Sequence, residues 1–156
     1  MATKIAFLFT LLAYSIIASQ AFMYILSLRN VQLNMSAATY TEFRKLIDTS
    51  MRSNLKYIIY LALLGNLTLV VLTVKNPGSI LFIAAIVSFV LLIADILLTL
   101  KCSLPINDVI NSWAPAAIPS NWQEFRTKWL TIFQYRQIAT ITGFLGLLVA
   151  AVFGSR

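Results

Sequence analysis

Four long apolar runs, separated by shorter polar stretches, dominate the pattern of hydrophobic positions along this chain. They cover about residues 5–28, 55–74, 80–100 and 132–153. Each run has the length of about 20 residues that a helix needs to cross the roughly 30 Å hydrocarbon core of a bilayer. The pattern therefore predicts an all-α membrane protein, in which residues 1–156 form one domain, an antiparallel bundle of four transmembrane helices.

The first run also has features of a secretory signal peptide. Lys4 precedes it, and Ser19-Gln20-Ala21 resembles a cleavage site. Because the apolar stretch continues past this point to Leu28, we interpret the run as a retained helix.

The connections between the runs differ at the two ends of the bundle. Residues 75–78 read Lys-Asn-Pro-Gly, which is turn chemistry, and they predict a tight hairpin between the second and third helices. The other connections, residues 29–54 and 101–131, both lie at the opposite end, which we call the head side. In the first of these, Thr39 and Glu42 fit a capping box, and apolar residues then recur at helical spacing. We therefore expect an amphipathic helical extension there.

The second head-side connection, residues 101–131, holds all three tryptophans of the chain and three of its four prolines. We expect Pro105 to end the third helix and the residues that follow it to form a lid loop over the mouth of the bundle. Ser120, with Gln123 after it, is expected to begin the fourth helix. A helix from Ser120 to Gly154 is about 50 Å long, so its first turns should stand above the hydrocarbon.

Composition supports the membrane assignment and removes several kinds of site. Hydrophobic residues make up 60% of the chain and charged residues 11%, against about 25% charged residues in soluble domains. The mean hydropathy is +0.85. There is no histidine and a single cysteine, Cys102, which excludes Cys/His zinc sites, histidine-ligated haem or iron, and a Ser-His-Asp triad. We therefore expect no metal and no classical cofactor.

The net charge of +7 indicates the orientation of the protein in the membrane rather than binding to nucleic acid, because the basic residues lie beside the apolar runs. Of the 12 lysines and arginines, nine lie on the head side, whereas Lys4, Lys75 and Arg156 lie on the other side. The positive-inside rule then places the head in the cytoplasm and both termini outside. We expect a bacterial inner membrane, with lipid as a partner and no nucleic acid.

One carboxylate, Asp95, lies inside the third apolar run. A charge at such a depth costs about 2.5–3.5 kcal/mol on insertion scales, so it needs a partner. At about 1.5 Å per residue, Gln20, Asp95 and Arg136 reach similar heights in the head-side third, and we predict that Arg136 pairs with Asp95. The pair is either a buried ion pair that fixes helix register or a catalytic or proton-binding site. For Gln20 and Asn66, the alternative to ligand binding is a hydrogen bond between helices.

Aromatic and basic residues share one face of the predicted fourth helix. They are Trp122, Arg126, Trp129, Phe133 and Arg136. An aromatic belt with snorkelling arginines explains such a face, whereas an inward face would bind a flat or anionic ligand. The depth difference of about 10 Å between two of the tryptophans favours the inward face. We expect a head-side ligand site whose contacts are Gln20, Asn107, Trp113, Trp122, Arg126 and Trp129.

This segment also carries a family resemblance. It reads Pro105-Ile106-Asn107, then Trp113, then Trp122-x3-Arg126-x2-Trp129-x6-Arg136. The pattern resembles the four-helix membrane family that includes the fungal anthrone oxygenases, most of whose bacterial members have no assigned function. The resemblance implies oxidation of polycyclic anthrones by dioxygen without a classical cofactor, and it carries over to Asn107, Trp113, Trp122, Arg126, Trp129 and Arg136. Relatives commonly have a histidine where this chain has Phe133, so a mechanism that depends on that histidine does not transfer.

Two hypotheses of different class follow. The first is an oxygenase or related oxidoreductase acting on an aromatic or quinone-like molecule, with Asp95 as the base and Arg136 or Arg126 stabilising the enolate. The second is a non-catalytic protein that binds a lipid or quinone, or that serves as an accessory subunit of a homo-oligomer or larger membrane complex. An enzyme needs a cavity that reaches Asp95, whereas an accessory subunit needs only a filled interior. No broken helix or inverted repeat supports transport.

Overall fold

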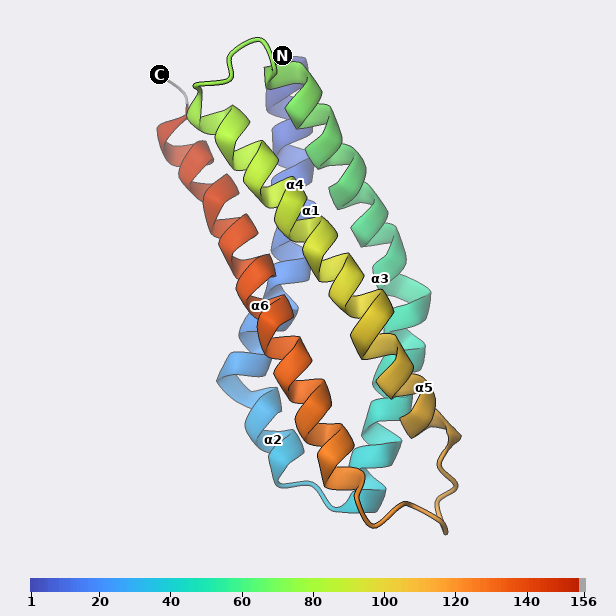
Figure 1. Cartoon of the computed structure of the whole chain (residues 1–156). Helices are drawn as coiled ribbons and strands as arrows, with labels where there is room; N and C mark the ends of the chain where they lie inside the picture. Colours follow the sequence, from blue (N-terminus) through green and yellow to red (C-terminus); the bar gives the residue numbers. More distant parts are fainter. Residues whose placement is uncertain (155–156) are drawn as a thin grey trace.

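Four long helical rods make up the fold in the computed structural model, which describes residues 1–154 (Figure 1). The first rod joins α1 (Ala2–Met23), the π-helical segment η1 (Tyr24–Leu28) and α2 (Arg29–Leu33). The second is α3 (Ala37–Thr73) alone. The third joins α4 (Ile80–Leu98), the π-helical segment η2 (Thr99–Ser103) and α5 (Leu104–Ser112), and the fourth is α6 (Trp122–Phe153).

Each rod is long and apolar enough to cross a membrane. The rods pack in the ring order α1, α3, α4, α6, because each contacts the two beside it. The N-terminus, the α3–α4 turn and the end of α6 lie at one end of the bundle, which we call the turn end, and the other two connections lie at the head (Figure 1). The predicted all-α, four-helix membrane architecture is confirmed.

The head-side extensions are more helical than predicted. Pro105 does not end the third helix, because the rod continues through η2 into α5 as far as Ser112. Pro105 lies in the first turn of α5, where a missing backbone N–H does no harm. The first rod likewise continues past Leu28, so that only residues 34–36 separate it from α3.

Two predicted helix starts are also corrected. Ser36, not Thr39, caps α3, since its Oγ accepts a hydrogen bond from the backbone N of Thr39 at 3.3 Å. The fourth helix begins at Trp122 rather than at Ser120, and no side chain caps it. The expected tight turn between α3 and α4 is confirmed, and Ser79 caps α4 through the backbone N of Phe82 at 3.1 Å.

A cluster of buried hydrophobic side chains forms the core of the turn half of the bundle. Its fully buried side chains include Tyr14, Leu69, Leu92 and Leu147. Asn66 joins α3 to α4 there, because its Oδ1 accepts a hydrogen bond from Ser88 Oγ at 2.6 Å. The interpretation of Asn66 as a residue that holds helices together is therefore confirmed.

Candidate functional site

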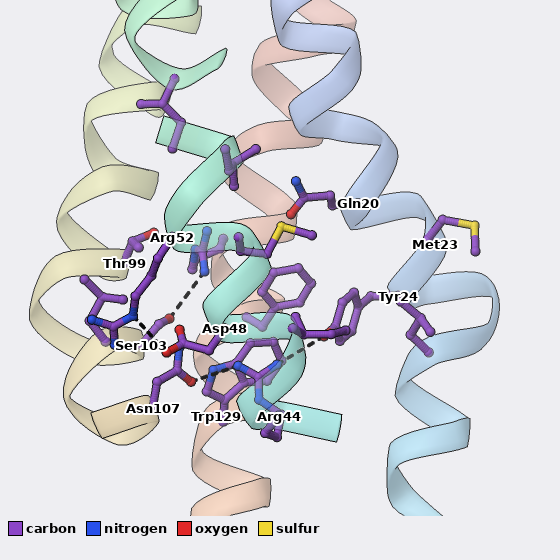
Figure 2. Close-up of a pocket in the computed structure, with 18 of the residues that line it drawn as sticks. Gln20, Met23, Tyr24, Arg44, Asp48, Arg52, Thr99, Ser103, Asn107 and Trp129 are labelled. Atoms are coloured by element: carbon purple, nitrogen blue, oxygen red, sulfur yellow. Dashed lines mark hydrogen bonds and ion pairs between the residues drawn. The ribbon is translucent and has the colours of Figure 1, made fainter. Parts of the chain in front are cut away.

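A cavity of about 430 Å³ lies in the head half, among all four rods (Figure 2). This volume is in the range of about 300–1,000 Å³ that small-molecule sites have. Most of the surface area that lines the cavity belongs to apolar atoms. The polar and charged lining residues are Ser19, Gln20, Arg44, Asp48, Arg52, Lys56, Thr99, Ser103, Asn107 and Arg136.

The two π-helical segments both contribute to the cavity wall. Tyr24 and Leu28 come from η1, and Thr99 and Ser103 come from η2. A π turn changes the direction in which the following side chains point, and such turns are frequent at functional sites. The first and third rods thus depart from α-helical geometry at the level of the cavity.

Arg44 is the most deeply buried cation of the cavity wall, with 3% of its surface exposed. Its Nη2 donates to Asn107 Oδ1 at 2.8 Å, and its Nη1 donates to the Tyr24 hydroxyl at 3.3 Å. Its guanidinium carbon lies 3.7 Å from the centroid of the Trp129 ring (Figure 2). Arg44, in α3, therefore contacts η1, α5 and α6 through neutral and aromatic partners.

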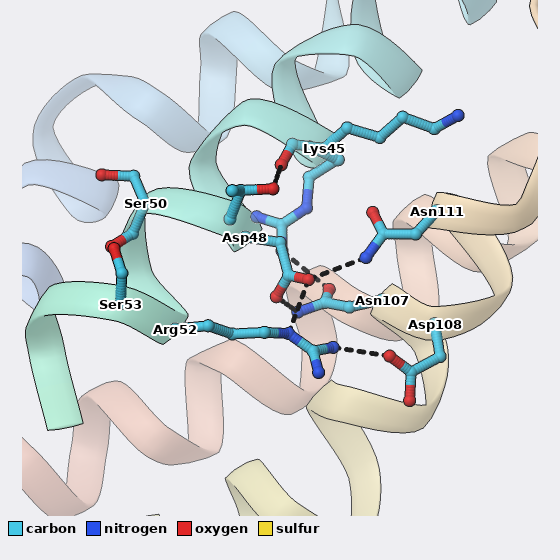
Figure 3. Close-up of polar contacts among 10 residues, drawn as sticks. Lys45, Asp48, Ser50, Arg52, Ser53, Asn107, Asp108 and Asn111 are labelled. Carbon is cyan, nitrogen blue, oxygen red and sulfur yellow. Dashed lines mark hydrogen bonds and ion pairs between the residues drawn. The ribbon is translucent and has the colours of Figure 1, made fainter.

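Asp48 is one helical turn further along α3 and is the carboxylate of the cavity wall. It accepts hydrogen bonds from Asn107 Nδ2 at 2.6 Å and from Asn111 Nδ2 at 2.8 Å. It also accepts one from Arg52 Nε at 2.8 Å, while Arg52 Nη2 reaches Asp108 Oδ1 at 2.6 Å (Figure 3). These contacts fasten α3 to α5 at the head.

The hydrogen-bond network of α3 is not among the contacts predicted from the sequence. Arg44, Asp48 and Arg52 are spaced by four residues and therefore share one helix face. That spacing was the available signal, but charged residues on an amphipathic helix are ordinarily in contact with solvent. Here α5 covers the face, and Arg44 and Asp48 are buried.

An aromatic wall forms the α1–α6 side of the cavity. The rings of Trp129 and Phe133 stack, with centroids 5.0 Å apart and planes inclined by 12°. The Tyr24 ring lies against both, at 4.3 Å from Phe133 and 5.6 Å from Trp129. All three residues line the cavity, which therefore offers a flat ligand an aromatic surface.

The predicted pairing of Asp95 with Arg136 is confirmed, with Arg136 Nε 2.7 Å from Asp95 Oδ1. Arg136 also lies 3.5 Å from Ser103 Oγ through Nη1. Asp95 is 2% exposed and does not line the cavity, whereas Arg136 does. Asp95 thus reaches the cavity only through Arg136, and this arrangement favours the ion-pair interpretation over a catalytic base in direct contact with a ligand.

The predicted ligand contacts separate into two groups. Gln20, Asn107 and Trp129 line the cavity, as expected. Trp113, Trp122 and Arg126 do not line it, so the expectation that all six surround one site is corrected.

The second group fastens the head instead. Arg126 Nη1 donates to the backbone oxygens of Gln32 and Leu33, at 3.1 and 3.0 Å, and so holds the end of α2. Trp122 lies beside Tyr40, at 5.7 Å between ring centroids. Trp113 is buried in the same cluster. The residues after it, expected to be a lid, therefore begin in a packed cluster rather than over the cavity.

We infer that the cavity opens where its lining residues are exposed, and we call this part of the lining the mouth. The exposed lining residues come from α1 and α3, and they are Ser19, Met23, Met51, Arg52 and Lys56. Both rods are long and apolar enough to cross a membrane.

No group of three or more cysteine, aspartate or glutamate side chains among residues 1–154 is arranged to hold a metal ion. The polar groups of the cavity wall are guanidinium, ammonium, amide and hydroxyl groups and the carboxylate of Asp48. Comparison of the chain with family models, with curated proteins and with solved structures finds no match. The interpretation of the site rests on its geometry.

Proposed function

We propose that this membrane protein binds a flat apolar molecule, aromatic or quinone-like, or a lipid, in the head-side cavity. The observation that supports the proposal is a ligand-sized cavity of about 430 Å³ with an aromatic wall made by Tyr24, Trp129 and Phe133. An opening at the exposed lining residues of α1 and α3 would give a lipid-soluble molecule a route from the bilayer.

Ligand binding is favoured over a purely structural role because an accessory subunit needs no such space. Oxidation of the bound molecule is the activity that the resemblance to anthrone oxygenases implies. It requires a base in contact with the ligand, and the two buried carboxylates are both engaged. Asp95 accepts from Arg136, and Asp48 accepts from Arg52, Asn107 and Asn111. Binding is therefore the function that we propose, with oxygen uptake in the presence of anthrone as the assay for any further chemistry.

Titration of the detergent-solubilised protein with menadione, a flat neutral quinone, tests the proposal through quenching of tryptophan fluorescence. We expect saturable quenching that falls strongly in Trp129→Phe, because this tryptophan lines the cavity. Trp122→Phe is the contrasting variant, since Trp122 lies outside the cavity wall, and it should keep the quenching. A linear, unsaturable response that is equal in all three proteins would contradict binding in this cavity.

We also propose that the protein resides in a bacterial inner membrane with its head in the cytoplasm. The support is the excess of lysine and arginine on the head side; Arg156, counted on the other side, lies outside the described residues. A green fluorescent protein fused to the C-terminus should stay dark, because we propose that this end is exported. Bright fluorescence would show that the C-terminus is cytoplasmic and would contradict the proposed orientation.

A further inference from the structure

We propose that the ligand of the head-side cavity is a monoanionic amphiphile, an acid with one carboxylate head and an apolar body, and that Arg44 binds the head. This inference rests on the proposed function, because it specifies the class of ligand for the same cavity. It is carried by the surroundings of Arg44, by the charges of the cavity wall and by the aromatic and apolar surface that lies beside those charges.

Arg44 is a buried cation without an anionic partner. No carboxylate oxygen among the described residues lies within 4.0 Å of its guanidinium. Its hydrogen-bond partners, Tyr24 and Asn107, are neutral, and its buried Nε has no partner at all. A guanidinium removed from water is costly unless it is paired and hydrogen-bonded. An anion in the cavity would satisfy that requirement.

Asp48 is the nearest candidate for a partner on the same helix, but it is held by other donors. Arg52, Asn107 and Asn111 all donate to its two oxygens. Asn107 stands between Asp48 and Arg44, accepting from the arginine and donating to the carboxylate. The charge of Asp48 is thus directed to Arg52, which leaves Arg44 free for a ligand.

The cavity wall carries a net positive charge, as Arg44 itself does. Four cations line the cavity: Arg44, Arg52, Lys56 and Arg136. Three carboxylates pair with them, since Arg52 contacts both Asp48 and Asp108, and Arg136 contacts Asp95. One positive charge remains in excess, which matches one negative charge on a ligand. Lys56 at the mouth adds attraction for an approaching anion.

The rest of the wall suits an apolar body. The Arg44 guanidinium lies over the Trp129 ring, so a carboxylate on Arg44 places the remainder of the molecule beside the aromatic wall. Met23 and Met51 line the side toward the mouth, and methionine adapts to bodies of different shape. Aromatic acids and long-chain acids share this chemistry, and the experiment separates them.

Calorimetric titration of the detergent-solubilised protein compares matched acids and amides. The probes are 2-naphthoate with its neutral counterpart 2-naphthamide, and dodecanoate with dodecanamide. We expect an acid to bind at least about tenfold more tightly than its amide, equivalent to about 1.4 kcal/mol. Tighter binding of naphthoate supports an aromatic acid, and tighter binding of dodecanoate supports an alkyl acid. Amides that bind as tightly as the acids overturn this inference and leave the proposed function standing, whereas no binding of any probe contradicts both.

Variants then assign the head to Arg44. Arg44→Gln should bind acid and amide equally, and Arg44→Lys should keep part of the preference because it keeps the charge. Arg29→Gln is the matched control, since Arg29 is an exposed head-side arginine outside the cavity wall, and it should bind as the wild type does. An acid preference that survives in a folded Arg44→Gln protein overturns the assignment, and the comparison of probes on the wild type stands even if Arg44→Gln does not fold.

Discussion

Asn107 in α5 donates from Nδ2 to Oδ1 of Asp48 in α3 across 2.6 Å. The same amide accepts from Arg44 at 2.8 Å through its oxygen, so one side chain serves a buried anion and a buried cation at once. Replacing it with leucine, which has a similar size, should lower the free energy of unfolding by about 2–3 kcal/mol, because hydrogen bonds to charged groups are lost. Unfolding in mixed micelles, followed by circular dichroism, measures the change.

Asn111→Leu is the control for that variant. Asn111 makes a single bond, to Asp48, and its loss should cost about 1 kcal/mol. Equal effects of the two replacements would mean that the bond of Asn107 to Arg44 contributes nothing.

The Asp95–Arg136 pair should behave as a coupled unit. Each of Asp95→Leu and Arg136→Met leaves a buried charge unpaired, which typically costs about 3–5 kcal/mol. The double variant should lose clearly less than the sum, and a double-mutant cycle on unfolding free energies measures the coupling. Strict additivity would contradict the pairing. An Asp95→Asn protein that binds ligand normally but has lost a measured oxygenase activity would instead support the catalytic interpretation.

Gly143 in α6 makes room for the hydroxyl of Tyr14 in α1. A Cβ at this position would overlap the hydroxyl oxygen, which itself donates to the backbone oxygen of Ser88 at 3.0 Å. Gly143→Ala should therefore destabilise the bundle by about 1–3 kcal/mol, and Tyr14→Phe in the same chain should restore part of the loss. Gly146→Ala is the matched control, because the space around Gly146 is open; a similar loss there would point to a helix-wide effect rather than this contact.

Two aspartates that share Arg52 should differ in their importance. Asp48 is 4% exposed, and Asp48→Asn should cost about 2–3 kcal/mol because a charge-assisted network is broken. The side chain of Asp108 is 64% exposed, and the pair it forms is screened by water, so Asp108→Asn should cost less than about 1 kcal/mol. Thermal unfolding of the two variants measures which substitution lowers the stability more. A larger loss in Asp108→Asn than in Asp48→Asn would contradict the prediction.

The helices and the Asp95–Arg136 pair could be predicted from sequence because their signals are local and strong. An apolar run of about 20 residues has few alternatives to a transmembrane helix. A carboxylate inside such a run demands a partner, and Arg136 was the cation at a matching depth. Helical rise alone was sufficient to find the pair.

The α3 network and the true ends of the rods could not be found in the same way. Arg44 and Asp48 look like surface charges until α5 covers them, and α5 exists only because the third rod continues through η2 past Pro105. A π turn has no reliable sequence signature, and the proline therefore predicts a helix end at a position where the rod in fact continues. Trp122, Arg126 and Trp129 do share one face of α6. The sequence does not predict α2, however, and Arg126 binds the end of α2 instead of lining the cavity.

The two π-helical segments give α2 and α5 a helical phase that differs from that of α1 and α4, whereas α3 and α6 run into the head as continuous α-helices. A π turn accommodates one residue more than an α turn. Deleting one residue within η2 would rotate α5 by about 100° relative to α4, which would carry Asn107 away from Asp48 while the packing of the turn half stayed unchanged. A single-residue deletion within η2 would thus change which residues α5 presents to the cavity, while α4 keeps its sequence and its packing in the turn half.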